Sequence, residues 1–229
     1  DVYYNGSTTK SHTERLRQFH NMFVKKTLIA CVSKEGDTLI DYGCGKGGDI
    51  PKWTSQKLSF VLGIDFSKDN IENRNDGVYA RYLNHSKRFA VMPKALFVNG
   101  DCSKNIRNGS AIEDDMYKEV IRSIFGQSEK DRFKTHMGIY DAYGIGKDGF
   151  KVSSCQFAMH YFFKSVETLH GFMRNVCECT AVNGYFIGTC YDGQVLMHEL
   201  SRYMFDEGLR VYDNQHLMCE IIKKYDSEE

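Results

Sequence analysis

Apolar residues recur along the chain with two different periods, and the change between them predicts the order of the elements. From residue 13 to residue 32, apolar side chains recur at roughly helical spacing, at Leu16, Phe19, Phe23, Leu28 and Ile29. This pattern predicts an N-terminal helix that Thr13 can cap. From about residue 36 onward, short β-rich runs alternate with helical patterns. That alternation is typical of a mostly parallel sheet covered by helices, so we predict an α/β fold.

The individual runs predict five strands and the helices between them. The predicted strands are Asp37–Tyr42, Phe60–Phe66, Ala95–Val98, Lys151–Cys155 and Tyr185–Cys190, the last one after a turn at Asn183-Gly184, and Met218–Lys223 is a candidate for one more. The predicted helices run through Trp53, begin near Ser67, and cover Asp114–Phe125, Ser165–Thr180 and Gln194–Phe205. The polar stretch 103–149 interrupts this order, and we interpret it as an insertion.

Length and composition fit one globular domain. A chain of 229 residues suits a single α/β domain, 1–229, in which 1–35 form an N-terminal helical extension. No apolar run approaches the roughly 18 residues of a membrane span, so no membrane partner is expected. The chain begins at Asp1 and carries no charged-then-apolar leader, so we expect it to be part of a longer protein.

Cysteine usage and charge exclude other classes. The eight cysteines are scattered through segments that are predicted to be buried, and we interpret them as reduced thiols of an intracellular, reducing compartment. The close pair Cys177 and Cys179 lacks the spacing of a zinc site, so no metal is expected. Thirty basic and thirty acidic residues cancel, so any contact with nucleic acid must be local.

A glycine cluster between the first strand and its helix indicates a nucleotide-type ligand. Gly43, Gly45 and Gly48 fit the pattern G-x-G-x-x-G, and Asp65 ends the next strand, where an acid can hold a ribose. Taken alone, this pattern fits a nicotinamide or flavin enzyme as well as a methyltransferase, because both need backbone that approaches a ligand closely.

Flanking charge favours the methyltransferase. Asp41 and Asp49 bracket the loop and would lie near the pyrophosphate of a dinucleotide. S-adenosylmethionine carries an ammonium and a sulfonium instead, for which carboxylates are favourable partners. Asp101, directly after the third strand, can accept from an adenine amino group, although a turn or cap role is the alternative for a single aspartate there.

A second motif follows the fourth strand and identifies a family. The runs Asp41-Tyr-Gly-Cys-Gly-Lys-Gly-Gly-Asp49 with Lys52-Trp53, and Cys155-Gln-Phe-Ala-Met-His-Tyr161, closely resemble messenger RNA cap guanine-N7 methyltransferases. Tyr3-Tyr4-Asn5, Leu16–Asn21 with Lys25, and Gly188–Asp192 match as well, so the resemblance covers almost the whole chain. Stretch 103–149 and its exit Gly146–Phe150 look most like the methyltransferase domain of capping enzymes from large DNA viruses.

The resemblance implies a fold, a donor, an acceptor and a set of site residues. The fold would be the class I, Rossmann-like S-adenosylmethionine-dependent methyltransferase sheet, here without its last strands. The donor S-adenosylmethionine would be held by Lys25, Asp41, Gly43, Asp49, Asp65, Asp101, Gln156, Phe157 and Tyr161. The capped 5′ end of messenger RNA would meet Asn21, Lys46, Lys52, Arg81, His160 and Tyr191, with His160 and Tyr161 positioning the guanine. Triphosphatase and guanylyltransferase domains, in the same or a partner chain, and a stimulatory subunit are the implied partners.

Three departures from the family pattern affect the cap pocket. The segment Phe19–Ile29 carries one residue more than the commonest spacing, which leaves His20 and Asn21 as alternatives for the cap-facing role. Tyr191 stands where many members have a proline. The family's downstream glutamate and tyrosine have no counterpart before Glu229.

Guanine N7 keeps its lone pair at neutral pH, so the implied reaction needs no general base. The residues leave three alternatives open: a methyltransferase for another RNA position or a small molecule, a non-catalytic RNA-binding module, and a nicotinamide oxidoreductase.

Overall fold

The computed structural model describes residues 14–226, which form two compact units. The larger unit spans Lys25–Cys190 and contains the main sheet. The smaller unit comprises the described residues up to Val24 together with those from Tyr191 onward. Tyr3-Tyr4-Asn5 and the predicted cap Thr13 lie outside the described residues. Within 14–226, each helix is too short or too polar to cross a bilayer.

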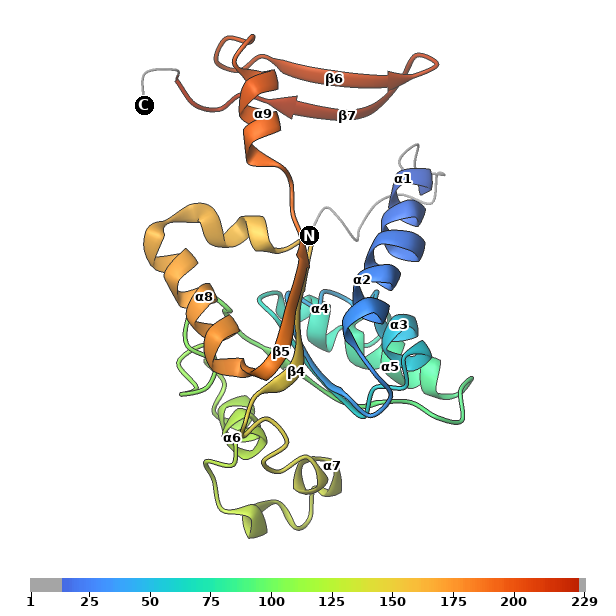
Figure 1. Ribbon diagram of the computed structural model, residues 1–229, viewed down its shortest axis with the longest axis vertical. Coiled ribbons are helices and arrows are strands. Elements are labelled where there is room, and N and C mark those ends of the chain that lie inside the picture. Colours follow the sequence, from blue (N-terminus) through green and yellow to red (C-terminus); the bar gives the residue numbers. More distant parts are fainter. Residues whose placement is uncertain (1–13, 227–229) are drawn as a thin grey trace. The chain divides into compact units, whose positions relative to one another are not determined.

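The larger unit is built on a parallel sheet with the order β3-β2-β1-β4-β5 (Figure 1). Its strands are β1 (Thr38–Tyr42), β2 (Phe60–Asp65), β3 (Lys94–Asn99), β4 (Phe150–Gln156) and β5 (Thr180–Thr189). All neighbouring pairs are parallel, so the carboxyl ends of the strands meet at one edge. The winding direction reverses between β1 and β4, and this switch point is where open α/β sheets bind ligands.

The five predicted strands are confirmed with bounds that differ by at most one residue, except at the start of β5. This strand begins at Thr180, whereas the sequence pattern predicted Tyr185. The register shifts between the pairs Phe150–Thr180 and Val152–Tyr185, and Asn183 has a φ of 60° there. The predicted turn at Asn183-Gly184 is therefore a bulge inside the strand.

Helices cover both faces of this sheet, each over its own apolar cluster. One face carries α2 (Lys25–Val32), α3 (Ile50–Ser55), α4 (Lys68–Glu72) and α5 (Val78–Ser86), whose side chains pack on Leu39, Val61 and Phe97. The other face carries α6 (Asp115–Ile124), η3 (Met159–Lys164) and α8 (Val166–Cys179). Ser67 caps α4 where the sequence predicted a helix to begin, and Ser165 caps α8. The segment after Ser67 forms two helices, whereas the sequence indicated one.

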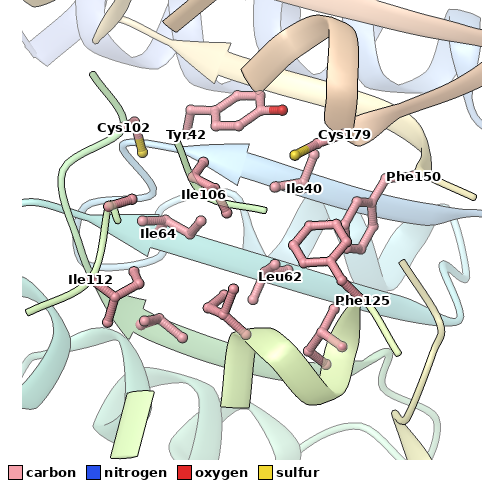
Figure 2. Packing of buried hydrophobic residues seen from close by; sticks show 14 of the residues in the cluster. Ile40, Tyr42, Leu62, Ile64, Cys102, Ile106, Ile112, Phe125, Phe150 and Cys179 are labelled. Atoms are coloured by element: carbon pink, nitrogen blue, oxygen red, sulfur yellow. The ribbon is translucent and has the colours of Figure 1, made fainter. Parts of the chain in front are cut away.

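Stretch 103–149 contributes directly to the core of the larger unit. Its helix α6 is capped by Asp114 and buries Ile121 and Ile124. Figure 2 shows Ile106, Ile112 and Phe125 from this stretch packed beside strand residues of β1 and β2. The stretch also holds η2 (Lys130–Phe133) and α7 (Met137–Asp141). Its status as a family insertion stays a prediction, but α6 serves as a crossover helix between β3 and β4.

The smaller unit contains the N-terminal helical turns and a hairpin. Its elements are α1 (Glu14–Phe19), the π-helix η1 (His20–Val24), α9 (Gly193–Leu200), β6 (Gly208–Asp213) and β7 (His216–Ile222). A π-helical turn accommodates one extra residue in a helix, which matches the extra residue noted after Phe19. The strand proposed near Met218 is confirmed as β7, and its antiparallel partner β6 was not predicted. Asn214 and Gln215 link the two strands with positive φ values, which suit a tight hairpin.

Candidate active site

The glycine loop fits tightly against the segment that follows β4. Gly43 has a φ of 76°, and a Cβ at this position would lie 2.6 Å from the Cβ of Ala158. The amides of Gly43 and Cys44 both donate to the carbonyl of Ile64, at 2.8 and 3.1 Å. Only glycine combines this backbone conformation with this close approach. The loop is thereby held at the carboxyl edge between β2 and β4.

Asp65 fixes the loop to the end of β2. Its Oδ2 accepts from the amide of Gly45 at 2.7 Å, and its Oδ1 accepts from the amide of Ser67 and from Nδ2 of Asn70, each at 2.9 Å. The side chain is 8% exposed. A carboxylate with three donors is held rigidly in place, and its free lone pairs at the sheet edge can accept hydrogen bonds from ribose hydroxyls.

Two lysines pair with one aspartate at the start of α3. The Lys25 ammonium lies 3.3 Å from Oδ2 of Asp49, and the Lys52 ammonium lies 2.8 Å from Oδ1 of the same carboxylate. Lys52 also donates to the carbonyl of Gly48 at 3.1 Å. The charge of Asp49 is therefore neutralised by Lys25 and Lys52. The same ion pair directs Lys52 toward the carboxyl edge of the sheet. The cap-facing role predicted for Lys52 stays a prediction.

Asp41, on β1, is the carboxylate that the protein does not neutralise. It is 2% exposed, and its Oδ1 accepts no hydrogen bond from any described residue. Burial, with a smaller contribution from the charge of Asp49, raises the pKa of Asp41 to about 8, against the opposing effects of Lys25 and the Ser154 hydroxyl. A cationic group placed beside Asp41 would favour its ionised form.

The loop after β4 completes the same edge. Gln156, the last residue of β4, accepts from the Thr189 hydroxyl at 3.1 Å, and the Phe157 amide donates to the Thr189 carbonyl and hydroxyl, each at 3.0 Å. Phe157 has a φ of 57°, an unusual value for a residue with a side chain. The Lys25 ammonium lies 5.7 Å from the centroid of its ring. These contacts unite Gln156, Phe157 and Lys25 with the loop at β1.

His160 and Tyr161 lie together in η3, directly beyond this loop. Their ring centroids are 4.3 Å apart, and Tyr161 is 71% exposed. Burial lowers the pKa of His160, so its imidazole is neutral at pH 7 and can donate or accept one hydrogen bond. A neutral imidazole beside an exposed ring suits a flat, uncharged purine edge.

Lys46 is placed differently from what its expected role suggests. Its side chain is 3% exposed, and its ammonium lies 2.9 and 2.8 Å from the carboxylate oxygens of Asp76 and 3.2 Å from Asp69. Hydrogen bonding to Asp76 raises the pKa of Lys46. A cap phosphate therefore has to compete with two carboxylates for this cation. Arg81 lies on α5, exposed to solvent.

Asp101 follows β3 and adopts the turn-capping arrangement that the sequence left as an alternative. Its Oδ1 accepts from the amide and the hydroxyl of Ser103, at 2.9 and 2.6 Å. The side chain is part-buried, and Lys104 lies 3.7 Å from Oδ2. One oxygen thus holds the turn, while a role toward adenine stays a prediction.

The structure brings most of the expected residues together within the larger unit. Asn21 and Tyr191 belong to the smaller unit, so their cap-facing roles stay predictions. Sequence reasoning missed Asn70, Thr189, Ala158 and the acidic partners of Lys46. The partners of Lys46 are Asp69 and Asp76. Their acidic side chains were the only signal in the sequence, because nothing in the sequence indicates that they pair with residue 46. Among residues 14–226, no group of His, Cys, Asp or Glu side chains is arranged to hold a metal ion, and all eight cysteines are free.

Strand order and site geometry define the class of protein. This is a doubly wound α/β domain with a glycine loop and buried aspartates at its switch point. A solved structure of the PH0226 protein from Pyrococcus horikoshii OT3 shares the fold with a TM-score of 0.51 at 16% identity, over 94% of this chain and 76% of that one. The mRNA (guanine-N(7))-methyltransferase domain model matches residues 3–216, so the chain belongs to that family.

Named relatives agree with this assignment. The chain is 25% identical to a probable mRNA-capping enzyme of Acanthamoeba polyphaga mimivirus, over 98% of this chain and 18% of the relative. It is 31% identical to an mRNA cap guanine-N(7) methyltransferase of Aspergillus niger, over 82% of this chain and 31% of the relative. An Arabidopsis thaliana relative of the same name is 25% identical over 83% of this chain and 42% of its own length. The chain thus spans less than half the length of these relatives.

Proposed function

We propose that the chain transfers the methyl group of S-adenosylmethionine to N7 of the guanosine that caps messenger RNA. The buried carboxylate of Asp41 supports this donor most directly. It lies at the switch point, has an oxygen that accepts no hydrogen bond from the described residues, and flanks a glycine loop with no room for a Cβ at Gly43. A pyrophosphate cannot stabilise the ionised form of this carboxylate, whereas the donor's ammonium supplies the missing partner.

The residues then divide into two groups by their place in the fold. Asp65, Gln156 and Lys25 hold the donor at the carboxyl edge. Contacts with Gly45, Thr189 and Phe157, respectively, keep these side chains in place before substrate arrives. His160 and Tyr161 hold the guanine, and the neutral imidazole avoids repelling the cationic donor. Bound donor supplies an electrophilic methyl on a sulfonium. Because guanine N7 carries a free lone pair, no general base is needed. The protein positions the guanine against the methyl group and excludes water.

Other parts of the capping pathway follow from the family assignment. The mimivirus relative bears the name of a capping enzyme and is more than five times longer than the matched segment. We extend the proposal to triphosphatase and guanylyltransferase domains in the same or a partner chain, to a stimulatory subunit, and to a reducing intracellular compartment. Eight free thiols are compatible with that compartment.

Transfer of labelled methyl from S-adenosylmethionine to RNA with an unmethylated guanosine cap tests the proposal. RNA with an N7-methylated cap serves as the control. Transfer to the first substrate alone supports S-adenosylmethionine as the donor and guanine N7 as the acceptor atom. It also supports the proposal that this chain suffices for the reaction. Transfer to both substrates identifies another methyl acceptor, and donor binding without transfer to either one contradicts the proposed acceptor for this chain.

A further inference from the structure

The segment that contains α5 combines positive charge with exposed rings, and the proposed cap site uses only its first arginine. Residues 77–100 contain no aspartate or glutamate, which makes this the longest acid-free run in a chain with equal numbers of acids and bases. Its cations are Arg81, Lys87, Arg88 and Lys94. Lys94 pairs with Asp141 at 2.9 Å, while no described carboxylate pairs with the other three. The uncompensated charge is therefore concentrated along α5 and the turn that follows it.

Helical geometry places part of this charge in one line. Arg81 and Arg88 are spaced at i and i+7, which puts them on one face of the helix and its last turn, and His85 lies between them. Burial and the charge of Arg88 lower the pKa of His85, so this ring adds no charge at pH 7. The Arg88 amide donates to the His85 carbonyl at 2.9 Å, so the helical turn continues to that residue. Tyr79 and Tyr82 anchor α5 through a different face, where their rings contact Phe97 edge-on. The basic face is thus held toward solvent by half-buried tyrosines.

An aromatic pair lies within the same line. The rings of His85 and Phe89 stack with centroids 4.3 Å apart and an interplanar angle of 21°. Phe89 is 47% exposed, and Leu83 is 59% exposed nearby on the helix. Exposed rings between unpaired cations are what sequence-independent binding of single-stranded nucleic acid requires, since phosphates meet the cations and bases stack on the rings.

The position of α5 relates this surface to the proposed cap site. Val78, at the start of α5, lies against the glycine loop, where a Cβ on Gly47 would be 2.7 Å from its Cγ2. The helix packs on α3 and α4 and leads away from the loop (Figure 1). A chain held by its cap at the loop can therefore continue along Arg81, His85 and Arg88.

We propose that the α5 surface, formed by Arg81, His85, Arg88 and Phe89, binds the single-stranded RNA that follows the cap. This inference rests on the proposed function for the nature of the substrate. It assigns to α5 the role of discriminating a capped transcript from a free cap nucleotide, because only the transcript reaches beyond the first arginine.

Charge reversal at Arg88 tests the proposal, with Lys34→Glu as the matched control. Lys34 is also exposed and has no ion pair among the described residues, but it lies between α2 and β1 and is not part of the α5 surface. We expect Arg88→Glu to raise the KM for a capped RNA of about 20 nucleotides roughly tenfold, while the KM for a cap dinucleotide stays unchanged. Lys34→Glu should leave both values near those of the unmodified protein. A KM that rises equally for both substrates, or for neither, overturns the proposal.

Binding of uncapped single-stranded RNA without donor separates this inference from the proposed function. Arg88→Glu should weaken that binding and lower the slope of log K against log salt by about one, whereas Phe89→Ala should weaken it with the slope unchanged. Such results would support the α5 surface even if the chain methylated no cap. Unchanged RNA binding in both variants overturns it, even if cap methylation is confirmed.

Discussion

The ammonium of Lys46 lies 2.9 and 2.8 Å from the two carboxylate oxygens of Asp76, in an ion pair that joins the glycine loop to the segment before α5. Asp69 adds a second carboxylate at 3.2 Å. Lys46 is 3% exposed, but the side chains of Asp76 and Asp69 are 51% and 48% exposed. The cluster is thus open to solvent on its acidic side, where a phosphate can displace a carboxylate.

Removing this competition should strengthen cap binding. We expect Asp76→Asn to lower the KM for a cap dinucleotide about threefold with kcat unchanged, because a half-exposed ion pair contributes little but has to be broken. Steady-state methyl transfer measures both constants. Asp69→Asn is the matched control and should have a smaller effect, since Asp69 makes one longer contact. A higher KM in Asp76→Asn would mean that the carboxylate orients Lys46 for the phosphate.

The close approach of Gly43 to Ala158 predicts a second effect. Gly43→Ala should reduce affinity for S-adenosylhomocysteine at least tenfold, because its Cβ would lie 2.6 Å from that of Ala158 and push the loop from the sheet edge. Isothermal titration calorimetry measures this loss. Gly36→Ala separates steric clash from backbone strain, since Gly36 has a φ of 89° and a Cβ added there would meet nothing within 4 Å. Equal affinities in the two variants would show that strain alone is responsible.

Burial of Asp41 predicts that stability depends on pH. Its pKa is raised from 3.8 to about 8 in the folded chain, so the folded state keeps a proton that the unfolded state loses. Stability from this group is complete below about pH 4 and is lost as pH rises toward 8. Each pH unit within that window changes the unfolding free energy by about 1.4 kcal/mol. Relative to Asp41→Asn, which cannot ionise, the unmodified protein should lose on the order of 4 kcal/mol between about pH 5 and pH 8.

Urea denaturation of both proteins across this pH range measures the difference in unfolding free energy. Subtraction removes the contributions of groups that titrate alike in both proteins. A difference that stays constant with pH would show that Asp41 is ionised in the folded chain throughout.

Much of the fold was predictable because its elements are encoded locally. The five strands are short apolar runs, and the caps at Ser67, Asp114 and Ser165 are residues that accept backbone hydrogen bonds. The bulge at Asn183 was misjudged as a turn, since a positive φ is compatible with either. The strand β6 was missed because its residues pair only with β7 and half of them are polar or glycine.

The site was predictable in its residue types but less so in its pairings. Asp41, Asp49 and Asp65 could be placed at one edge because parallel strands end together. Their different surroundings could not. Asp49 pairs with Lys25 from a distant segment, Asp65 accepts from Asn70 only because α4 turns back toward it, and Asp41 is enclosed by the fold. The turn at Asp101 was recognised as an alternative, yet only the structure shows Ser103 as its partner.

The separation between donor-facing and cap-facing residues gives the last prediction. His160→Ala should raise the KM for the cap about tenfold and leave the Kd for S-adenosylhomocysteine unchanged, because His160 lies beyond the loop that holds Lys25 and Phe157. Asp65→Asn should raise the Kd for S-adenosylhomocysteine and leave the KM for the cap unchanged. The asparagine side chain has one oxygen and one NH2 group, so one of the two positions that accept from the Gly45 amide and the Asn70 amide becomes a donor. Calorimetry gives the donor Kd, and methyl transfer at saturating donor gives the KM for the cap. If both variants lost donor affinity to the same extent, His160 would belong to the donor site, and the proposed cap contact would have to be sought among the other residues of η3.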